Sequence, residues 1–135
     1  MSGTVVVGYI PTPEGIAAFE RAKDEAVLDG STLVVVNAGQ SGNFTSPTFA
    51  SPADIDAIDT ELSGAGIAHE VIQATDQLAP AEEILRVAAE KGARLIVIGV
   101  RRRTPVGKLI LGSTSQQVLL DAQCPVLAVK AARAG

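Results

Sequence analysis

The sequence predicts an α/β fold: an open five-stranded parallel β-sheet with helices on both faces. Three observations support this prediction. Short apolar runs rich in β-branched residues alternate with segments of helical periodicity, the pattern of successive βαβ units. Prolines and glycines stand where helices commonly begin and end. The length of 135 residues suits one core, so we expect a single domain over residues 1–135.

The first unit comprises the segments Thr4 to Ile10, Pro13 to Asp29 and Thr32 to Ala38. The first and last are predicted strands, and the uniformly apolar second strand is expected to be buried on both faces. The middle segment is a predicted helix that ends at Gly30. Its expected core face carries apolar residues at helical spacing, namely Ile16, Phe19, Ala22 and Ala26.

The second unit follows a polar loop. Ser51 is expected to cap a helix that begins at Pro52 and ends near Gly64. The apolar side of this helix carries Ile55, Ile58 and Leu62. The next strand, Ala68 to Gln73, is more polar than the others, which indicates a position at an edge of the sheet.

The remaining elements complete a set of five strands and four helices. A helix is predicted over Pro80 to Lys91, followed by a strand over Leu95 to Ile98. A last helix opens at Gly112, and a last strand covers Pro125 to Val129. In an open parallel sheet of this kind, ligands lie at the carboxyl ends of the strands, where the strand order reverses.

The loop from Gly99 to Leu111 has the features of an anion site. A Gly112-Ser113 helix start follows it, and the Ser113-x-x-Gln116 spacing matches a capping box. The start of a helix presents unpaired N–H groups and a partial positive charge. Four cations share the loop, namely Arg101, Arg102, Arg103 and Lys108. These features predict a bound phosphate-like anion, and the alternative is a basic loop that is simply solvated.

The charge distribution favours the anion site over a general nucleic-acid surface. Residues 1–93 hold 4 Lys/Arg against 14 Asp/Glu, whereas residues 94–135 hold 7 against 1. Positive charge is therefore concentrated around one loop and its flanks, so nucleic-acid binding is not expected. No apolar run reaches the length of a membrane span and no signal peptide is visible, so we expect a cytoplasmic protein without a membrane partner.

Other chemistry has little support in the sequence. Gly107-Lys108 fails as a phosphate-binding Walker loop because Arg102 and Leu109 replace residues that the loop needs. His69 is the only histidine and is expected to be satisfied or exposed, so no metal site is predicted. Cys124 is the only cysteine, and its place before an apolar strand indicates a small core residue.

The loop and its flanks resemble those of the universal stress proteins, whose nucleotide-binding members carry Gly-x2-Gly-x9-Gly-Ser/Thr after the fourth strand. Here the motif stands as Gly99-Val100-Arg101-Arg102, nine residues, then Gly112-Ser113. The tail LLDAQCPVLAV and the opening VVVGYI match in position too. The resemblance implies a Rossmann-like three-layer sandwich of the adenine-nucleotide alpha hydrolase type and a homodimer formed through Pro125 to Val129. Members of one branch of the family bind a nucleotide, so the resemblance also implies bound ATP or AMP.

The resemblance also implies which residues bind the nucleotide. Carried over by position, they are Gly8, Ile10, Ala38, Ile98, Gly99, Arg101, Arg102, Gly112, Ser113 and Thr114. Two of them depart from the nucleotide-binding pattern. Arg102 occupies the second glycine position, where its side chain either contacts the phosphate or blocks it. Ile10 occupies the position of a nucleoside-contacting Asp.

Three classes of function remain open. The favoured one is a stress-response or signalling protein that binds an adenine nucleotide weakly. The second is a dimerising interaction module with a vestigial pocket. A slow nucleotide hydrolase is least favoured, because the chain between Arg94 and Leu120 contains no Asp, Glu or His to serve as a base or to hold a metal. We therefore expect no enzyme.

Overall fold

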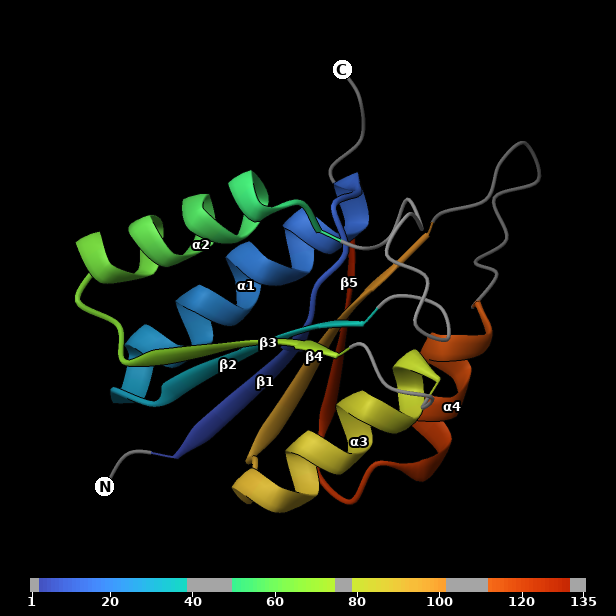
Figure 1. Cartoon of the computed structure of the whole chain (residues 1–135). Coiled ribbons are helices and arrows are strands. Elements are labelled where there is room, and N and C mark those ends of the chain that lie inside the picture. The colour runs from blue at the N-terminus through green and yellow to red at the C-terminus, as the bar shows by residue number, and fades with distance from the viewer. Residues whose placement is uncertain (1–2, 39–49, 75–78, 102–111, 132–135) are drawn as a thin grey trace.

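The computed structural model describes residues 3–38, 50–74, 79–101 and 112–131. Within these residues, five strands alternate with four helices (Figure 1). The strands are β1 (Thr4–Gly8), β2 (Thr32–Ala38), β3 (His69–Ala74), β4 (Leu95–Val100) and β5 (Val126–Lys130). The helices are α1 (Pro13–Asp29), α2 (Pro52–Gly64), α3 (Pro80–Lys91) and α4 (Ser113–Asp121).

The strands form one parallel sheet in the order β3-β2-β1-β4-β5. Helices α1 and α2 cover one face, and α3 and α4 cover the other (Figure 1). The predicted fold class and the edge position of β3 are confirmed. The order reverses between β1 and β4, so the carboxyl ends of these two strands mark the place where a ligand is expected.

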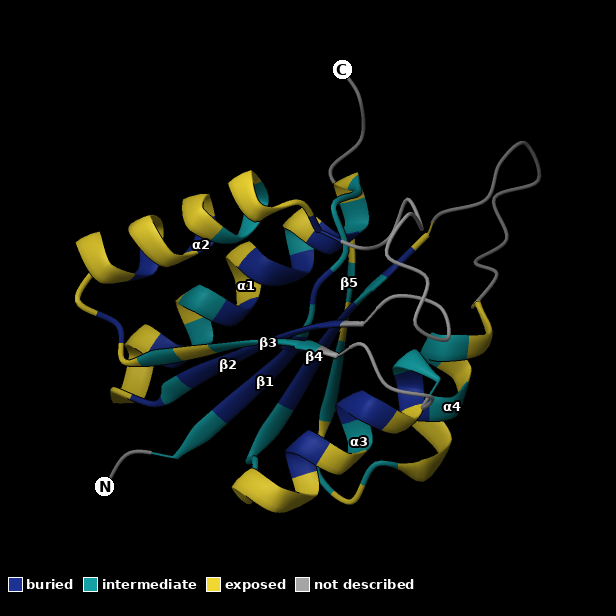
Figure 2. Ribbon diagram, in the orientation of Figure 1, coloured by how far each residue is buried: buried dark blue, intermediate teal, exposed yellow. Residues whose placement is uncertain are grey.

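Each face of the sheet carries its own core, because successive side chains of a strand point to opposite faces. The α1 side buries the side chains of Val5, Val7, Leu33, Val35 and Val97. The α3 side buries those of Val6, Val34, Val36, Ile96 and Ile98. Figure 2 shows these strands in dark blue between two helix layers whose outer sides are exposed. Each fully buried side chain of this size contributes about 1.5–3 kcal/mol.

Helix α1 begins and ends as the sequence predicts. The side chain of Thr12 accepts a hydrogen bond of 3.1 Å from the N–H of Gly15, and Pro13 occupies the first turn. Gly30 ends the helix with a φ of 69°, in the left-handed region that favours glycine. One expected core residue is wrong, since Ile16 is 50% exposed. The smaller Gly15 and Ala18 are buried instead, because the first turn of the helix lies close to the sheet.

Several strand boundaries differ from the prediction. Strand β1 stops at Gly8, because the chain turns next and the N–H of Thr12 donates to the carbonyl of Ile10 at 2.8 Å. Strand β4 continues past Ile98 to Val100, and β5 starts one residue late, at Val126. The paired register of Val100 with Lys130 accounts for the longer carboxyl ends of both strands.

His69 connects the edge strand β3 to helix α2. Its Nε2 lies 2.7 Å from Oδ1 of Asp59, and its Nδ1 lies 2.8 Å from the carbonyl oxygen of Ile67. The hydrogen bond to Asp59 raises the pKa of His69 above its ordinary value of 6.5. The prediction that this histidine is satisfied is confirmed. Asp59 of α2 is the side chain that satisfies it.

Candidate functional site

The candidate site lies at the carboxyl edge of the sheet. Strands β1, β2 and β4 end there at Gly8, Ala38 and Val100, and α4 starts there at Ser113. A hydrogen bond joins two of these parts, because the hydroxyl of Ser115 donates to the carbonyl of Gly99 at 3.4 Å. The structure therefore places the end of β4 against the first turn of α4, as the anion-site prediction requires.

The start of α4 differs from the predicted capping box. Gly112 is the N-cap, with φ of −69° and ψ of 167°, and no side chain caps the helix among the described residues. Ser113 is already the first helical residue, so it stands one position too late to cap. The prediction of a capping box between Ser113 and Gln116 is therefore wrong. The uncapped start leaves backbone N–H groups of this turn without a side-chain acceptor.

The first turn of α4 also lacks a negative charge, which separates it from the other described helices. Acidic residues occupy the first turns of α1, α2 and α3, namely Glu14, Asp54, Glu82 and Glu83. A carboxylate in this position partly neutralises the positive end of the helix dipole. In α4 that end is not neutralised by its own side chains, so its electrostatics suit an external anion.

Glu14 contacts Arg101, the first cation of the basic loop, a placement that the sequence analysis missed. Its Oε2 lies 3.6 Å from Nε of Arg101, and the side chains are 12% and 63% exposed. The two residues are far apart in sequence, but α1 follows β1 and Arg101 follows β4. They come together because β1 and β4 are neighbours in the sheet. Knowledge of the strand order would have predicted this contact.

Two glycines allow close backbone approaches at the start of α1, one between β4 and the helix and one between the helix and the turn at Ile10. A Cβ atom on Gly99 would lie 2.2 Å from the carbonyl oxygen of Glu14. A Cβ atom on Gly15 would lie 1.9 Å from the carbonyl oxygen of Ile10. Real Cβ atoms do not approach backbone oxygens so closely. The glycine at position 99 thus has a packing role toward α1, in addition to the phosphate contact that the family motif implies.

The nucleoside end of the predicted site is built on the ends of β1 and β2. Gly8 packs under α3, and a Cβ atom there would lie 2.7 Å from Cδ1 of Ile84. The side chain of Ile98 is buried in the core on the α3 side, and the backbone of Ala38 pairs in register with Ala74. The contacts predicted for Gly8, Ala38 and Ile98 with a nucleoside stay predictions.

Asn37 organises the same edge, and the sequence analysis did not single it out. Its side chain is fully buried and donates to the carbonyl of Tyr9 at 2.9 Å. Its oxygen accepts from the N–H of Ala50 at 2.8 Å and from Nε2 of Gln73 at 3.0 Å. A single amide in an otherwise apolar strand was the available signal, because a buried polar group needs partners. Asn37 thereby fixes the chain beside the predicted nucleoside contacts.

Part of the predicted anion site falls outside the described residues. Arg102, Arg103 and Lys108 belong to this part, so their contacts with a phosphate stay predictions. Ser113 and Thr114 are described in the first turn of α4, where Ser113 is exposed. Among the described residues, no group of three or more His, Cys, Asp and Glu side chains could hold a metal ion.

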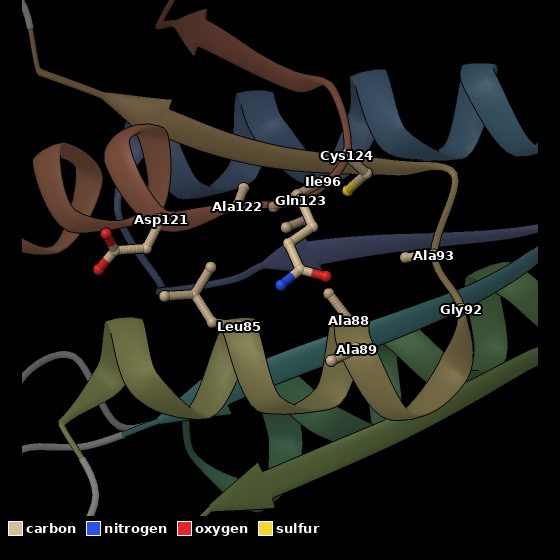
Figure 3. Close-up of a pocket in the computed structure, with 10 residues that line it drawn as sticks. All are labelled: Leu85, Ala88, Ala89, Gly92, Ala93, Ile96, Asp121, Ala122, Gln123 and Cys124. Carbon is tan, nitrogen blue, oxygen red and sulfur yellow. The ribbon is translucent and has the colours of Figure 1, made fainter.

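A pocket of about 360 Å³ lies at the opposite end of α3 and α4, beside the start of β4 (Figure 3). Gln123 points into it between Leu85 and Ala88, and the thiol of Cys124 lines its wall. Cys124 is half-buried and packs against the core on the α3 side, which agrees with the predicted core residue. Burial raises the pKa of its thiol.

None of the described helices is both long and apolar enough to cross a membrane.

Comparisons with known proteins agree with the fold and the motif. A sequence model of the universal stress protein family matches residues 1–130. A universal stress protein of Mycolicibacterium smegmatis is 39% identical over 126 residues, which cover 93% of this chain and 96% of that protein. A universal stress protein of Thermus aquaticus is 34% identical over 140 residues, covering 96% of this chain and all of that protein.

Solved structures give the same result. A universal stress protein of Archaeoglobus fulgidus superposes with a TM-score of 0.78 at 28% identity, covering 96% of this chain and 99% of that chain. A structure of the universal stress protein from the same organism in complex with dAMP has a TM-score of 0.62 at 25% identity. It covers 96% of this chain and 98% of its own.

Proposed function

Because this chain belongs to the universal stress protein family, we propose that it is a stress-response or signalling protein that binds an adenine nucleotide weakly. ATP or AMP binds with its phosphates at the loop between β4 and α4. The observation that carries this proposal is the start of α4, which no side chain among the described residues caps and whose first turn has no acidic residue. The similar Archaeoglobus fulgidus protein in complex with dAMP supports the choice of an adenine nucleotide.

The expected affinity is low because the nucleoside end lacks a carboxylate. Ile10 stands after β1, at the position where the nucleotide-binding pattern of the family has an Asp. A charge-assisted hydrogen bond of this kind contributes about 1.5–3 kcal/mol. The phosphate end keeps Gly99, Gly112 and the dipole of α4. The phosphates therefore supply most of the binding free energy in this proposal, and the nucleoside supplies less.

The nucleotide is a ligand in this proposal and not a substrate. Among the described residues, Glu14 is a carboxylate that contacts a cation of the basic loop, namely Arg101. A base for hydrolysis must reach the attacking water and accept its proton. An ion-paired carboxylate at the start of α1 is poorly suited to that role. The cytoplasmic location expected from the sequence stays a prediction.

We also propose that two copies of the chain form a homodimer through β5. This strand pairs with β4 on one side only in the described chain, so its other edge carries unpaired backbone groups. An exposed edge strand invites pairing with another strand. Pairing with a second copy about a twofold axis satisfies these groups on both subunits.

Ile10 also favours a second candidate function, a dimerising interaction module whose pocket binds no nucleotide. Calorimetric titration with ATP, AMP and adenosine separates the two. We expect both nucleotides to bind more tightly than adenosine, and their affinities to fall as salt is added, because the phosphates interact with cations and a helix dipole. Adenosine binding as tightly as AMP, with no dependence on salt, would contradict the proposed role of α4.

A further inference from the structure

Glu14 is held in a fixed position at the edge where the nucleotide is proposed to bind. Thr12 caps α1 just before it, and the close approach of Gly99 to the carbonyl of Glu14 leaves its backbone no room to move toward β4. The close approach of Gly15 to Ile10 holds the helix start against the preceding turn. Gly99 is also the residue whose carbonyl accepts from Ser115 at the start of α4. The first turn of α1 and the first turn of α4 therefore both contact the end of β4, through the same residue.

The carboxylate of Glu14 is turned toward Arg101, at the end of β4. Its side chain is 12% exposed, and its ion-pair partner among the described residues is Arg101, at 3.6 Å. Arg101 follows β4 directly and is the first of the loop cations. Glu14 therefore places a negative charge beside the proposed phosphate site. It also engages Arg101, a cation that a phosphate would otherwise attract.

We infer that Glu14 determines which nucleotide the site accepts, by lowering its affinity for triphosphates more than for monophosphates. The inference rests on the proposed nucleotide site. Coulomb repulsion between a fixed carboxylate and a ligand grows with the charge of the ligand. ATP carries more negative charge than AMP, so ATP loses more binding free energy to the same carboxylate. Glu14 thus shifts the preference of the site toward an adenine monophosphate.

The test is the substitution Glu14→Gln, which keeps the shape of the side chain and removes its charge. We expect the affinity for ATP to rise about tenfold and that for AMP about threefold, as repulsion falls and Arg101 is released. The matched control is Asp24→Asn. Asp24 is exposed on the same helix, about 15 Å along its axis, beyond the screening length of about 8 Å at physiological salt. The control changes the net charge equally and should leave both affinities unchanged.

A second variant separates a charge effect from a structural one. In the background of Arg101→Gln, the gain from Glu14→Gln should be smaller, because the cation that Glu14 engages among the described residues has already been removed. If nucleotides bind and the ratio of ATP to AMP affinity is the same in wild type and Glu14→Gln, the inference is wrong while the proposed function stands. If no variant binds any nucleotide, the proposed function itself is wrong. Thermal unfolding of each variant confirms that the measured protein is folded.

Discussion

Replacing Gly99 with alanine is expected to lower the free energy of unfolding by about 1–3 kcal/mol or more. The added Cβ would lie 2.2 Å from the carbonyl oxygen of Glu14, and 2.6 Å from its carbonyl carbon. Both atoms belong to the backbone of a capped helix, so no flexible side chain can move aside. The helix start must shift away from β4 instead. Chemical denaturation followed by circular dichroism measures the loss.

The matched control for this substitution is Gly64→Ala. Gly64 ends α2, and a Cβ atom there meets nothing within 4 Å. This variant should be as stable as wild type or slightly more stable, by up to about 1 kcal/mol, because alanine favours the helix. Equal stability of Gly99→Ala and wild type would mean that the first turn of α1 does not rest on β4. Glu14 would then not be held in a fixed position.

Replacing Ala128 with proline is expected to convert the proposed dimer into a monomer. The N–H of Ile96 donates to the carbonyl of Pro125 at 3.0 Å, so the backbone groups of Pro125 point toward β4. Backbone groups alternate in direction along a strand. Those of Leu127 then also face β4, and those of Ala128 face the free edge. Proline removes the outward N–H of Ala128 while leaving the ladder with β4 intact.

The choice of Ala128 depends on the packing of its neighbours. Leu127 and Val129 pack against the core on the α1 side, so charged or proline substitutions there would disturb the fold of the single subunit. Ala128 is exposed and can be changed without that effect. Ala128→Val keeps the N–H and serves as the control that should remain dimeric. Sedimentation velocity reports both, and a dimer that survives Ala128→Pro would place the interface elsewhere.

The sequence was sufficient for the fold because local signals and the overall pattern agree. The first three helices begin at a proline, Pro13, Pro52 and Pro80, as predicted. The exposure of Ile16 could not be predicted from periodicity alone. The close seating of α1 on β4 decides which side of that helix faces the sheet, and this contact joins residues distant in sequence.

The candidate site was predicted less completely than the fold. The motif located Gly99, Gly112 and the start of α4, but the spacing of Ser113 and Gln116 predicted a capping box that the structure lacks. A capping box depends on which residue adopts the extended N-cap conformation, and here Gly112 adopts it. The contact between Glu14 and Arg101 follows from strand order, which no local pattern in the sequence contains.

The most direct test of the proposed nucleotide site is a calorimetric titration of wild type and Ile10→Asp with ATP. Ile10 begins the turn after β1, where its carbonyl accepts a hydrogen bond from the N–H of Thr12. The family resemblance implies that an Asp at this position contacts the nucleoside. We predict saturable, weak binding by wild type and binding tighter by about 1.5–3 kcal/mol, or roughly ten- to a hundredfold, in the variant. The absence of saturable binding at millimolar ATP in both proteins would contradict this prediction. The pocket would then be vestigial, and the protein would be an interaction module.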